Sequence, residues 1–68
     1  MIILPANVHA EALIDQSSNV FKFQNTLANS GNVNAQFKLA SMYEEGEGVK
    51  KDIEQAKHWY KIAAQGGS

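Results

Sequence analysis

The feature that most restricts the fold of this chain is a set of helix-ending signals that recurs after 36 residues. The segment LANSGN at positions 27–32 and the segment AAQGGS at positions 63–68 have the same layout. Each places an alanine before a glycine that can end a helix, and then a residue that favours the start of the next helix, Asn32 or Ser68. The spacing predicts a repeat protein, and it predicts that the chain stops at a boundary between repeats.

The clearest predicted helix follows Asp52, which suits the N-cap position, with Gln55 three residues later in an arrangement like a capping box. At about 100° per residue the apolar side chains that follow gather on one side, and the polar ones on the other. The pattern predicts an amphipathic helix that ends at Gly66 and Gly67. Its apolar side consists of Ile53, Ala56, Trp59, Tyr60, Ala63 and Ala64.

A second helix is predicted from about Val33 to Glu45, between Asn32 as N-cap and Gly46 as terminator. The connection that follows is GEGVKK at 46–51, in which we expect Val49 to fill the space between the helix ends. Two helices joined by so short a loop should lie antiparallel as a hairpin. The residues that gather on one flank of this helix are Ala35, Leu39, Ala40, Met42 and Tyr43.

The first helix is predicted from about Ala10 to Asn29. The alternative is a break at residues 17–19, with Ser18 capping a shorter second piece. We favour one helix because four apolar residues share a single stripe. No segment of the chain shows the alternation of apolar and polar residues that is typical of a strand. The sequence therefore predicts an all-α protein of about three helices. The residues of that stripe are Leu13, Val20, Phe23 and Leu27.

A shift of 36 residues places the first predicted helix on the last one. Phe23 then falls on Trp59, an aromatic residue on an aromatic residue, and the apolar positions Val20, Leu27 and Ala28 fall on Ala56, Ala63 and Ala64. The first helix thus corresponds to the second helix of a preceding repeat. The chain divides into an N-terminal segment 1–9, a half repeat 10–31 and one full repeat 32–67.

The N-terminal segment has a four-residue apolar run that Pro5 interrupts and that no basic residue precedes. It is too short for a membrane span and lacks the layout of a signal peptide. Residues 8–10 nevertheless suit recognition by a signal peptidase. Segment 1–9 is therefore either disordered, plainly helical, or what remains of an export signal. The cytoplasm is the default compartment, and the periplasm or secretion follows if a signal peptide lies upstream.

The stretch NAQFKLASMYEEGEGVKKDIEQAKHWYKIAAQGG at 34–67 resembles a Sel1-like repeat, a relative of the tetratricopeptide repeat. Ala40 departs from the pattern, since the family usually has glycine there, and Gln24 stands where Tyr60 stands in the full repeat. The absence of cysteine excludes the disulfide-pinned variant of the repeat found in some bacterial relatives. The matching positions are Ala35, Gln36, Leu39, Met42, Tyr43, Gly46, Gly48, Val49, Asp52, Ala56, Trp59, Tyr60, Ala63, Ala64 and Gly67.

The resemblance implies the antiparallel helical hairpin of an α-solenoid, in which Tyr43 and Trp59 meet across the hairpin. It also implies a non-catalytic adaptor or scaffold that binds a protein, a peptide or further repeats, since Sel1-like arrays, many of them bacterial, serve in this way. The alternative is a truncated structural fragment of a longer array without a function of its own. A third hypothesis is an enzyme accessory or a small hydrolase.

Two apolar residues lie off the main stripes and are candidates for partner contact. Phe37 points away from the flank of Leu39 and Tyr43, and we expect it to pack on the first helix or to contact a partner. Ile62 lies off the apolar side of the last helix, and we expect it to face a further repeat. Helical phase places Trp59 and Tyr60 with the core rather than on a base-stacking surface.

Composition excludes several other functions. A net charge of −1 without arginine is not the charge pattern of a nucleic-acid-binding protein. Glu54 and His58 offer two metal ligands on one helix face, whereas a zinc site needs three or four. The serines lack the motifs of an activated nucleophile. We therefore expect no catalytic residue, no cofactor and no metal.

Overall fold

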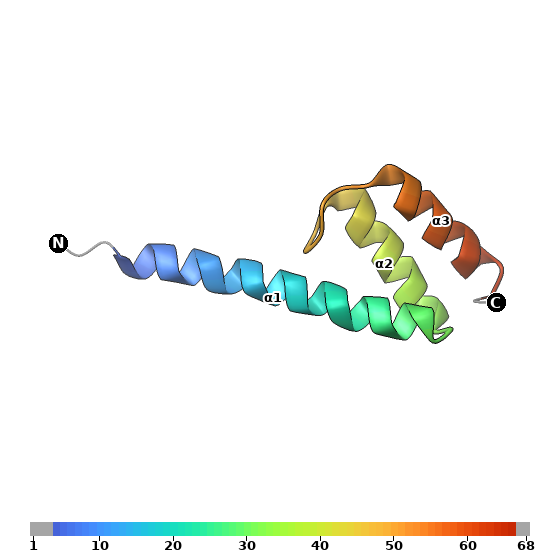
Figure 1. The fold of residues 1–68 in the computed structure, drawn as a ribbon, viewed down its shortest axis with the longest axis horizontal. Helices are drawn as coiled ribbons and strands as arrows, with labels where there is room; N and C mark the ends of the chain where they lie inside the picture. Colours follow the sequence, from blue (N-terminus) through green and yellow to red (C-terminus); the bar gives the residue numbers. More distant parts are fainter. Residues whose placement is uncertain (1–3, 67–68) are drawn as a thin grey trace.

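The computed structural model describes the backbone of residues 4–66 and the side chains of residues 16–66. It contains the helices α1 (Leu4–Asn29), α2 (Val33–Glu45) and α3 (Ile53–Ala64), and the described residues form no strand (Figure 1). The prediction of an all-α fold with three helices is confirmed.

α1 is one continuous helix, so the predicted single helix is correct and the break at residues 17–19 does not occur. It begins at Leu4, six residues before the predicted start at Ala10. Pro5 lies in the first turn, where a missing backbone N–H costs nothing because that N–H has no acceptor within the helix. Residues 4–9 of the N-terminal segment are thus helical, and residues 1–3 lie outside the described part.

The predicted caps define α2 and the start of α3. Asn32 Oδ1 accepts a hydrogen bond from the Ala35 amide at 2.9 Å, and Asp52 Oδ1 accepts one from the Gln55 amide at 3.1 Å. Gly46 ends α2 with a φ of +72° and donates its N–H to the Met42 carbonyl. These side chains satisfy amide groups that have no partner within the helix.

The predicted end of α3 at a glycine pair is described at Gly66. Gly66, with a φ of +83°, is the glycine that follows the helix, and its N–H donates to the Ala63 carbonyl at 3.0 Å. Gly67, which was also predicted to close the repeat, lies outside the described residues.

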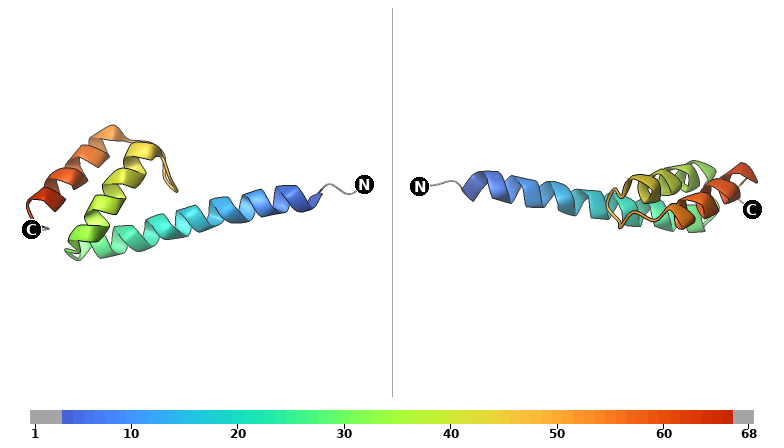
Figure 2. Two further views of the ribbon diagram at one scale, coloured as in Figure 1. Left: turned by 180° about the vertical axis from the view of Figure 1, so that it is seen from behind. Right: turned by 90° about the horizontal axis from the view of Figure 1, so that it is seen from above.

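α2 and α3 form the predicted hairpin, and α2 packs on the C-terminal half of α1 (Figure 2). The N-terminal half of α1 extends beyond the hairpin, which makes the molecule long and thin at 55 × 20 × 11 Å. The core therefore lies at one end of the molecule, where α1, α2 and α3 come together.

The core is built around Leu39, which is completely buried with Ala28 and Ala35. Tyr43 and Trp59 both pack against this cluster, as do Phe21 and Leu27. The ring of Tyr43 meets the ring of Phe21 edge to face, with centroids 5.4 Å apart. Alanines at the helix contacts let the backbones approach, and the larger side chains fill the remaining space.

The loop between α2 and α3 rests on α1. Gly48 has a φ of +74°, and a Cβ at this position would collide with the Ser17 carbonyl oxygen and lie 3.2 Å from the Phe21 Cβ. The Asp52 amide donates to the Tyr43 carbonyl at 2.9 Å, and Val49 is half-buried. The loop thus joins the hairpin to the preceding helix as well as α2 to α3.

Candidate functional site

α1 and α3 both contact α2, but they do so with different faces. We call the face of α1 that contacts α2 the forward face, and the residues 36 positions later the forward face of α3. We call the face of α3 that is buried against α2 the backward face, and the residues 36 positions earlier the backward face of α1. The forward face of α1 contains Ser17, Phe21, Gln24 and Ala28, and its equivalents 36 residues later are Ile53, Lys57, Tyr60 and Ala64. The backward face of α1 contains Val20, Phe23 and Leu27, and its equivalents in α3 are Ala56, Trp59 and Ala63.

Burial shows which faces are covered. On the forward faces, Ala28 of α1 is 2% exposed, whereas Ala64 of α3 is exposed. On the backward faces the order is reversed, because Val20 of α1 is 50% exposed and Ala56 of α3 is 3% exposed. The exposed apolar side chains are therefore Val20 and Phe23 on the backward face of α1, and Ile53, Tyr60 and Ala64 on the forward face of α3, whereas Leu27 packs against the core.

Three residues of the predicted apolar side of α3 belong to the forward face and lie at the surface. Ile53, Tyr60 and Ala64 are exposed, whereas Ala56 and Ala63 are buried and Trp59 is half-buried. The expectation that Trp59 and Tyr60 belong together in the core is thus wrong for Tyr60. The reason is geometric: one straight helix can turn only part of a wide apolar stripe toward a single neighbour.

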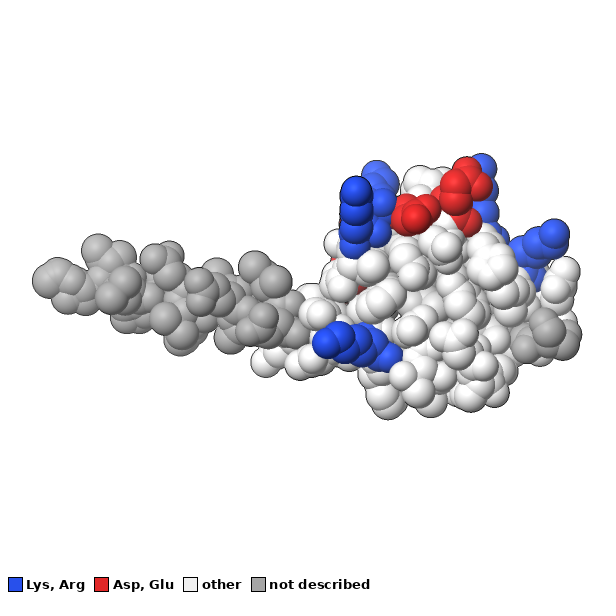
Figure 3. Space-filling view, in the orientation of Figure 1, with Lys and Arg blue, Asp and Glu red and all other residues white. Residues whose placement is uncertain are grey.

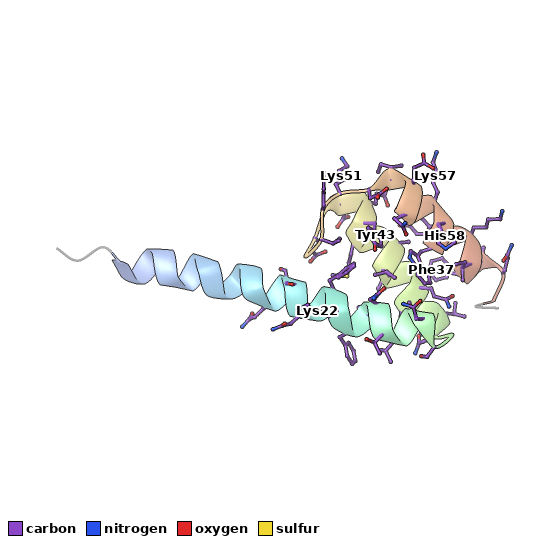
Figure 4. All side chains as sticks on the ribbon, in the orientation of Figure 1. Lys22, Phe37, Tyr43, Lys51, Lys57 and His58 are labelled. Carbon is purple, nitrogen blue, oxygen red and sulfur yellow. The ribbon has the colours of Figure 1, made fainter. Side chains whose placement is uncertain are left out.

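Phe37 lies beside α3 rather than on α1, so its expected packing partner is corrected. Its ring centroid is 6.3 Å from that of Tyr60, and Phe37 remains 45% exposed (Figure 4). The residues of α2 that contact α1, among them Gln36 and Tyr43, lie on a different side of the helix. The short loop places α3 next to the Phe37 side, where the ring of Tyr60 meets that of Phe37.

Tyr60 is held in place by α2. Its hydroxyl donates to Glu44 Oε1 at 2.9 Å. This hydrogen bond is the main cause that raises the pKa of Tyr60 above its ordinary value of 10.0, and burial and the negative charge of Glu44 act in the same direction. Phe37, Tyr60 and Glu44 therefore form a fixed aromatic and acidic rim along the junction of α2 and α3.

Ile62 lies on another side of the hairpin, so the structure does not bring it together with Phe37 in one site. It is half-buried and lines a pocket of about 390 Å³ with Trp59, Gln36, Ala28 and the turn after α1. Gln36 is 1% exposed, and its Nε2 donates to the Ala28 carbonyl at 3.0 Å. Its Oε1 is buried without a hydrogen-bond partner among the described residues.

The burial of Gln36 could not be read from helical phase alone, because glutamine is mostly an exposed residue. Its place beside Ala35 in the repeat pattern was the one available signal. In the structure it links α2 to the last turn of α1, where carbonyl groups lack partners within the helix. Gln36 thus adds a hydrogen bond to the apolar packing between the forward face of α1 and α2.

A second depression, of about 290 Å³, lies between α1 and α2. It is lined by Val20, Gln24, Lys38, Ser41, Met42 and Glu47. Charged side chains gather over the loop and α3, and much of the remaining described surface in this view is uncharged (Figure 3). Within the part of the chain that the structure describes, no His, Cys, Asp or Glu side chains cluster as a metal site would require. Over the same residues, no helix has the length and hydropathy of a membrane span.

The family model of the Sel1 repeat matches residues 33–68, which is more than half of the 68-residue chain. The match begins at the first residue of α2 and contains the loop and α3. No curated protein and no solved structure matches the chain.

Proposed function

Because the chain belongs to the Sel1 repeat family, we propose that it is a non-catalytic protein–protein interaction module, an adaptor or scaffold that binds a protein or peptide. The helical-repeat fold supports this function, since such folds present side chains on extended surfaces. We assign no catalytic residue, cofactor or metal to it.

The exposed aromatic pair carries the proposal. Phe37 is nearly half exposed and Tyr60 is exposed, and their rings contact each other across the junction of α2 and α3. Aromatic residues are enriched at protein interfaces because they bring a large contact area with few rotatable bonds. The hydrogen bond from Tyr60 to Glu44 fixes one ring in advance, which lowers the entropy cost of binding.

Ile62 is the second proposed contact residue. It lines the pocket beside Trp59, and the uncharged lining of that pocket, which includes Asn29 and Gln36, suits a neutral side chain of a partner. Because Ile62 and Phe37 lie on different sides of the hairpin, a partner that contacts both must reach two sides of it.

Partner capture tests the proposal. The tagged full chain is used to capture proteins from a lysate of the source cells, with photo-cross-linkers placed at positions 37 and 62. Phe37→Ala should reduce capture of a specific partner at least severalfold while circular dichroism shows unchanged helicity.

Phe23→Ala is the matched control, since Phe23 is an equally large exposed ring on the backward face of α1. Equal losses for Phe23→Ala and Phe37→Ala would contradict the assignment of the partner to the rim. Cross-links that are no more frequent at positions 37 and 62 than at a charged surface position such as Lys50 would contradict the proposed function.

The uncovered faces favour a second candidate, a structural role within a longer stack of repeats. Repeat units of this kind gain stability from their neighbours. A chain with this role should capture no separate partner, and its melting temperature should rise when further repeats are fused after α3.

A further inference from the structure

The rim at the junction of α2 and α3 combines two exposed aromatic rings with a carboxylate. We propose that this rim, formed by Phe37, Tyr60 and Glu44, binds an arginine side chain of the partner. The inference rests on the proposed function, since the rim is the contact surface assigned there, and it adds the chemistry of the partner residue that the rim receives.

Helical spacing and one contact between helices bring the three residues together. Phe37 and Glu44 are about two turns apart in α2, and both lie on the side of α2 that meets Tyr60 (Figure 4). The Tyr60 side chain connects them, because its ring centroid is 6.3 Å from that of Phe37 and its hydroxyl donates to Glu44 Oε1 at 2.9 Å. A flat group that stacks on the Tyr60 ring therefore lies within reach of the Glu44 carboxylate.

The aromatic part of the rim is open. Phe37 is 45% exposed and Tyr60 is 37% exposed. The planes of the two rings are tilted by 55°, so neither ring is stacked flat on the other. The faces of aromatic rings carry partial negative charge and attract cations, and arginine is found over such faces more often than lysine. The open rings thus suit a cationic side chain as well as an apolar one.

The electrostatics of the rim favour the cation. Glu44 lies in the last turn of α2, at the negative end of the helix dipole. The pKa of Tyr60 responds to this negative potential: the hydrogen bond to Glu44 raises it most, burial and the charges of Glu44 and Glu45 raise it further, and Ser41 acts in the opposite direction. A carboxylate can accept about four hydrogen bonds, and the bond from Tyr60 is one of them. Glu44 can therefore accept N–H groups of a partner as well.

The combination of rings and carboxylate selects arginine over lysine. A planar guanidinium can stack on a ring face and donate N–H groups from its edge to a carboxylate at the same time. The ammonium group of lysine is a compact and strongly hydrated charge, which gains less from a ring. Because the Tyr60 ring and the Glu44 carboxylate are joined by a hydrogen bond, one guanidinium can use both.

Three lysines of the chain oppose the binding of a cation. One follows Phe37 in α2, and the other two lie before and after Tyr60 in α3. Their long side chains keep the ammonium groups in water, so that their repulsion is weakened by the solvent. We therefore expect weak binding that improves when one of them is replaced. These exposed residues are Lys38, Lys57 and Lys61.

Four short peptides test the proposal against the full chain. Each has a central residue between two pairs of glycines, with blocked ends, and the central residue is arginine, lysine, citrulline or leucine. Citrulline has the shape of arginine without its charge. Binding at low salt is followed by chemical shifts of the ¹⁵N-labelled chain, which detect millimolar association and locate it. The arginine peptide should shift the amides of Phe37, Glu44 and Tyr60, and it should bind about fivefold more tightly than the citrulline peptide and about twofold more tightly than the lysine peptide.

Four variants with unchanged circular dichroism make the result specific. Glu44→Gln keeps an acceptor for the Tyr60 hydroxyl but removes the charge, so it should abolish the preference for arginine over citrulline. Glu54→Gln is the matched control, because it removes the same charge from an exposed position of α3 outside the rim, and it should leave that preference unchanged. Phe37→Leu should weaken binding of the arginine peptide about threefold, and Lys57→Met should strengthen it about twofold.

The proposal is overturned if the arginine peptide causes no saturable shifts at the rim, or if the citrulline, leucine or lysine peptide binds at least as tightly. It is also overturned if Glu44→Gln has no more effect than Glu54→Gln. If the peptides fail while partner capture still depends on Phe37, arginine is rejected and the proposed function stands. Capture that does not depend on Phe37 would contradict the proposed function itself.

Discussion

Val20 in α1 and Ala56 in α3 stand at equivalent positions, yet half of Val20 is exposed and almost none of Ala56 is. Ala28 and Ala64 show the opposite order. The two helices share the apolar positions of the backward face and the alanine pair Ala28 and Ala64, and both contact α2. For these shared positions, the difference is whether α2 comes after the helix, as for α1, or before it, as for α3.

The comparison teaches that the repeat pattern specifies two faces on each such helix, and that the neighbours present decide which face is buried. The apolar stripe of a helix includes the residues of every face with which the helix can pack. In this molecule α2 packs against both α1 and α3, so one face of α1 and one face of α3 remain at the surface. The predictions below test the covered faces first and the uncovered ones last.

The largest effect is expected from Leu39→Ala, because Leu39 is completely buried against α1 and near Trp59 of α3. Loss of this side chain should lower the free energy of unfolding by about 3 kcal/mol. Urea denaturation followed by circular dichroism measures it. Phe23→Ala on the uncovered face of α1 should change the same quantity by less than about 0.5 kcal/mol, and similar losses for the two variants would show that the face of Phe23 is covered.

Gly48→Ala tests the contact of the loop with α1. The substitution places a Cβ against the Ser17 carbonyl and also strains a backbone of positive φ, so it should destabilise by about 2 kcal/mol or more. Gly66→Ala is the matched control, because its φ is also positive but its Cβ would meet no atom within 4 Å. It should cost about 1 kcal/mol. Equal costs would mean that the loop does not rest on α1.

Gln36→Glu tests the polar contact that holds the forward face of α1. Burial raises the pKa of the introduced carboxyl above the unfolded value of about 4.3, so the variant should match the wild type below pH 4 and lose stability as the pH rises toward the folded pKa. The loss should reach about 2 kcal/mol at pH 7.

Gln36→Leu is the control for that measurement. It removes the hydrogen bond to Ala28 together with the unpartnered Oε1, and it should change stability by less than about 1 kcal/mol at any pH. A Gln36→Glu chain as stable at pH 7 as at pH 4 would show that position 36 is open to water.

The smallest effect is expected at the uncovered face of α3. Tyr60→Phe removes an exposed hydrogen bond to Glu44 and should cost about 0.5 kcal/mol or less. Since the folded pKa of Tyr60 is raised, its contribution is present below pH 10 and is lost as the pH rises through the folded value. In a Tyr43→Phe background, ultraviolet titration should show that Glu44→Gln lowers the pKa of Tyr60, and an unchanged pKa would contradict the contact.

Much of the fold followed from local signals in the sequence. Asn32, Gly46 and Asp52 lie where their cap chemistry predicts, because each satisfies backbone groups within its own segment. The exposure of Tyr60 and the orientation of Phe37, which local signals did not predict, depend on how the helices pack against each other. Tyr60 is exposed because it lies at the edge of the contact between α3 and α2, where it meets Phe37 and Glu44.

The candidate site was predicted only in part. Phe37 and Ile62 were found from their phase, since both lie off the main stripes, and the structure places them on different sides of the hairpin. The forward face of α3 was read as core, because periodicity does not distinguish a face that meets its own hairpin partner from one that meets a further helix. The shift of 36 residues, combined with burial, makes that distinction.

Thiol accessibility tests the central claim most directly, because the chain contains no cysteine and each position can be labelled alone. Single cysteines at positions 20, 28, 56 and 64 are reacted with a maleimide under native conditions and compared with the unfolded chain. Cysteines at 20 and 64 should react nearly as fast as in urea, and those at 28 and 56 should be strongly protected. Equal protection within either equivalent pair, 20 with 56 or 28 with 64, would contradict the account.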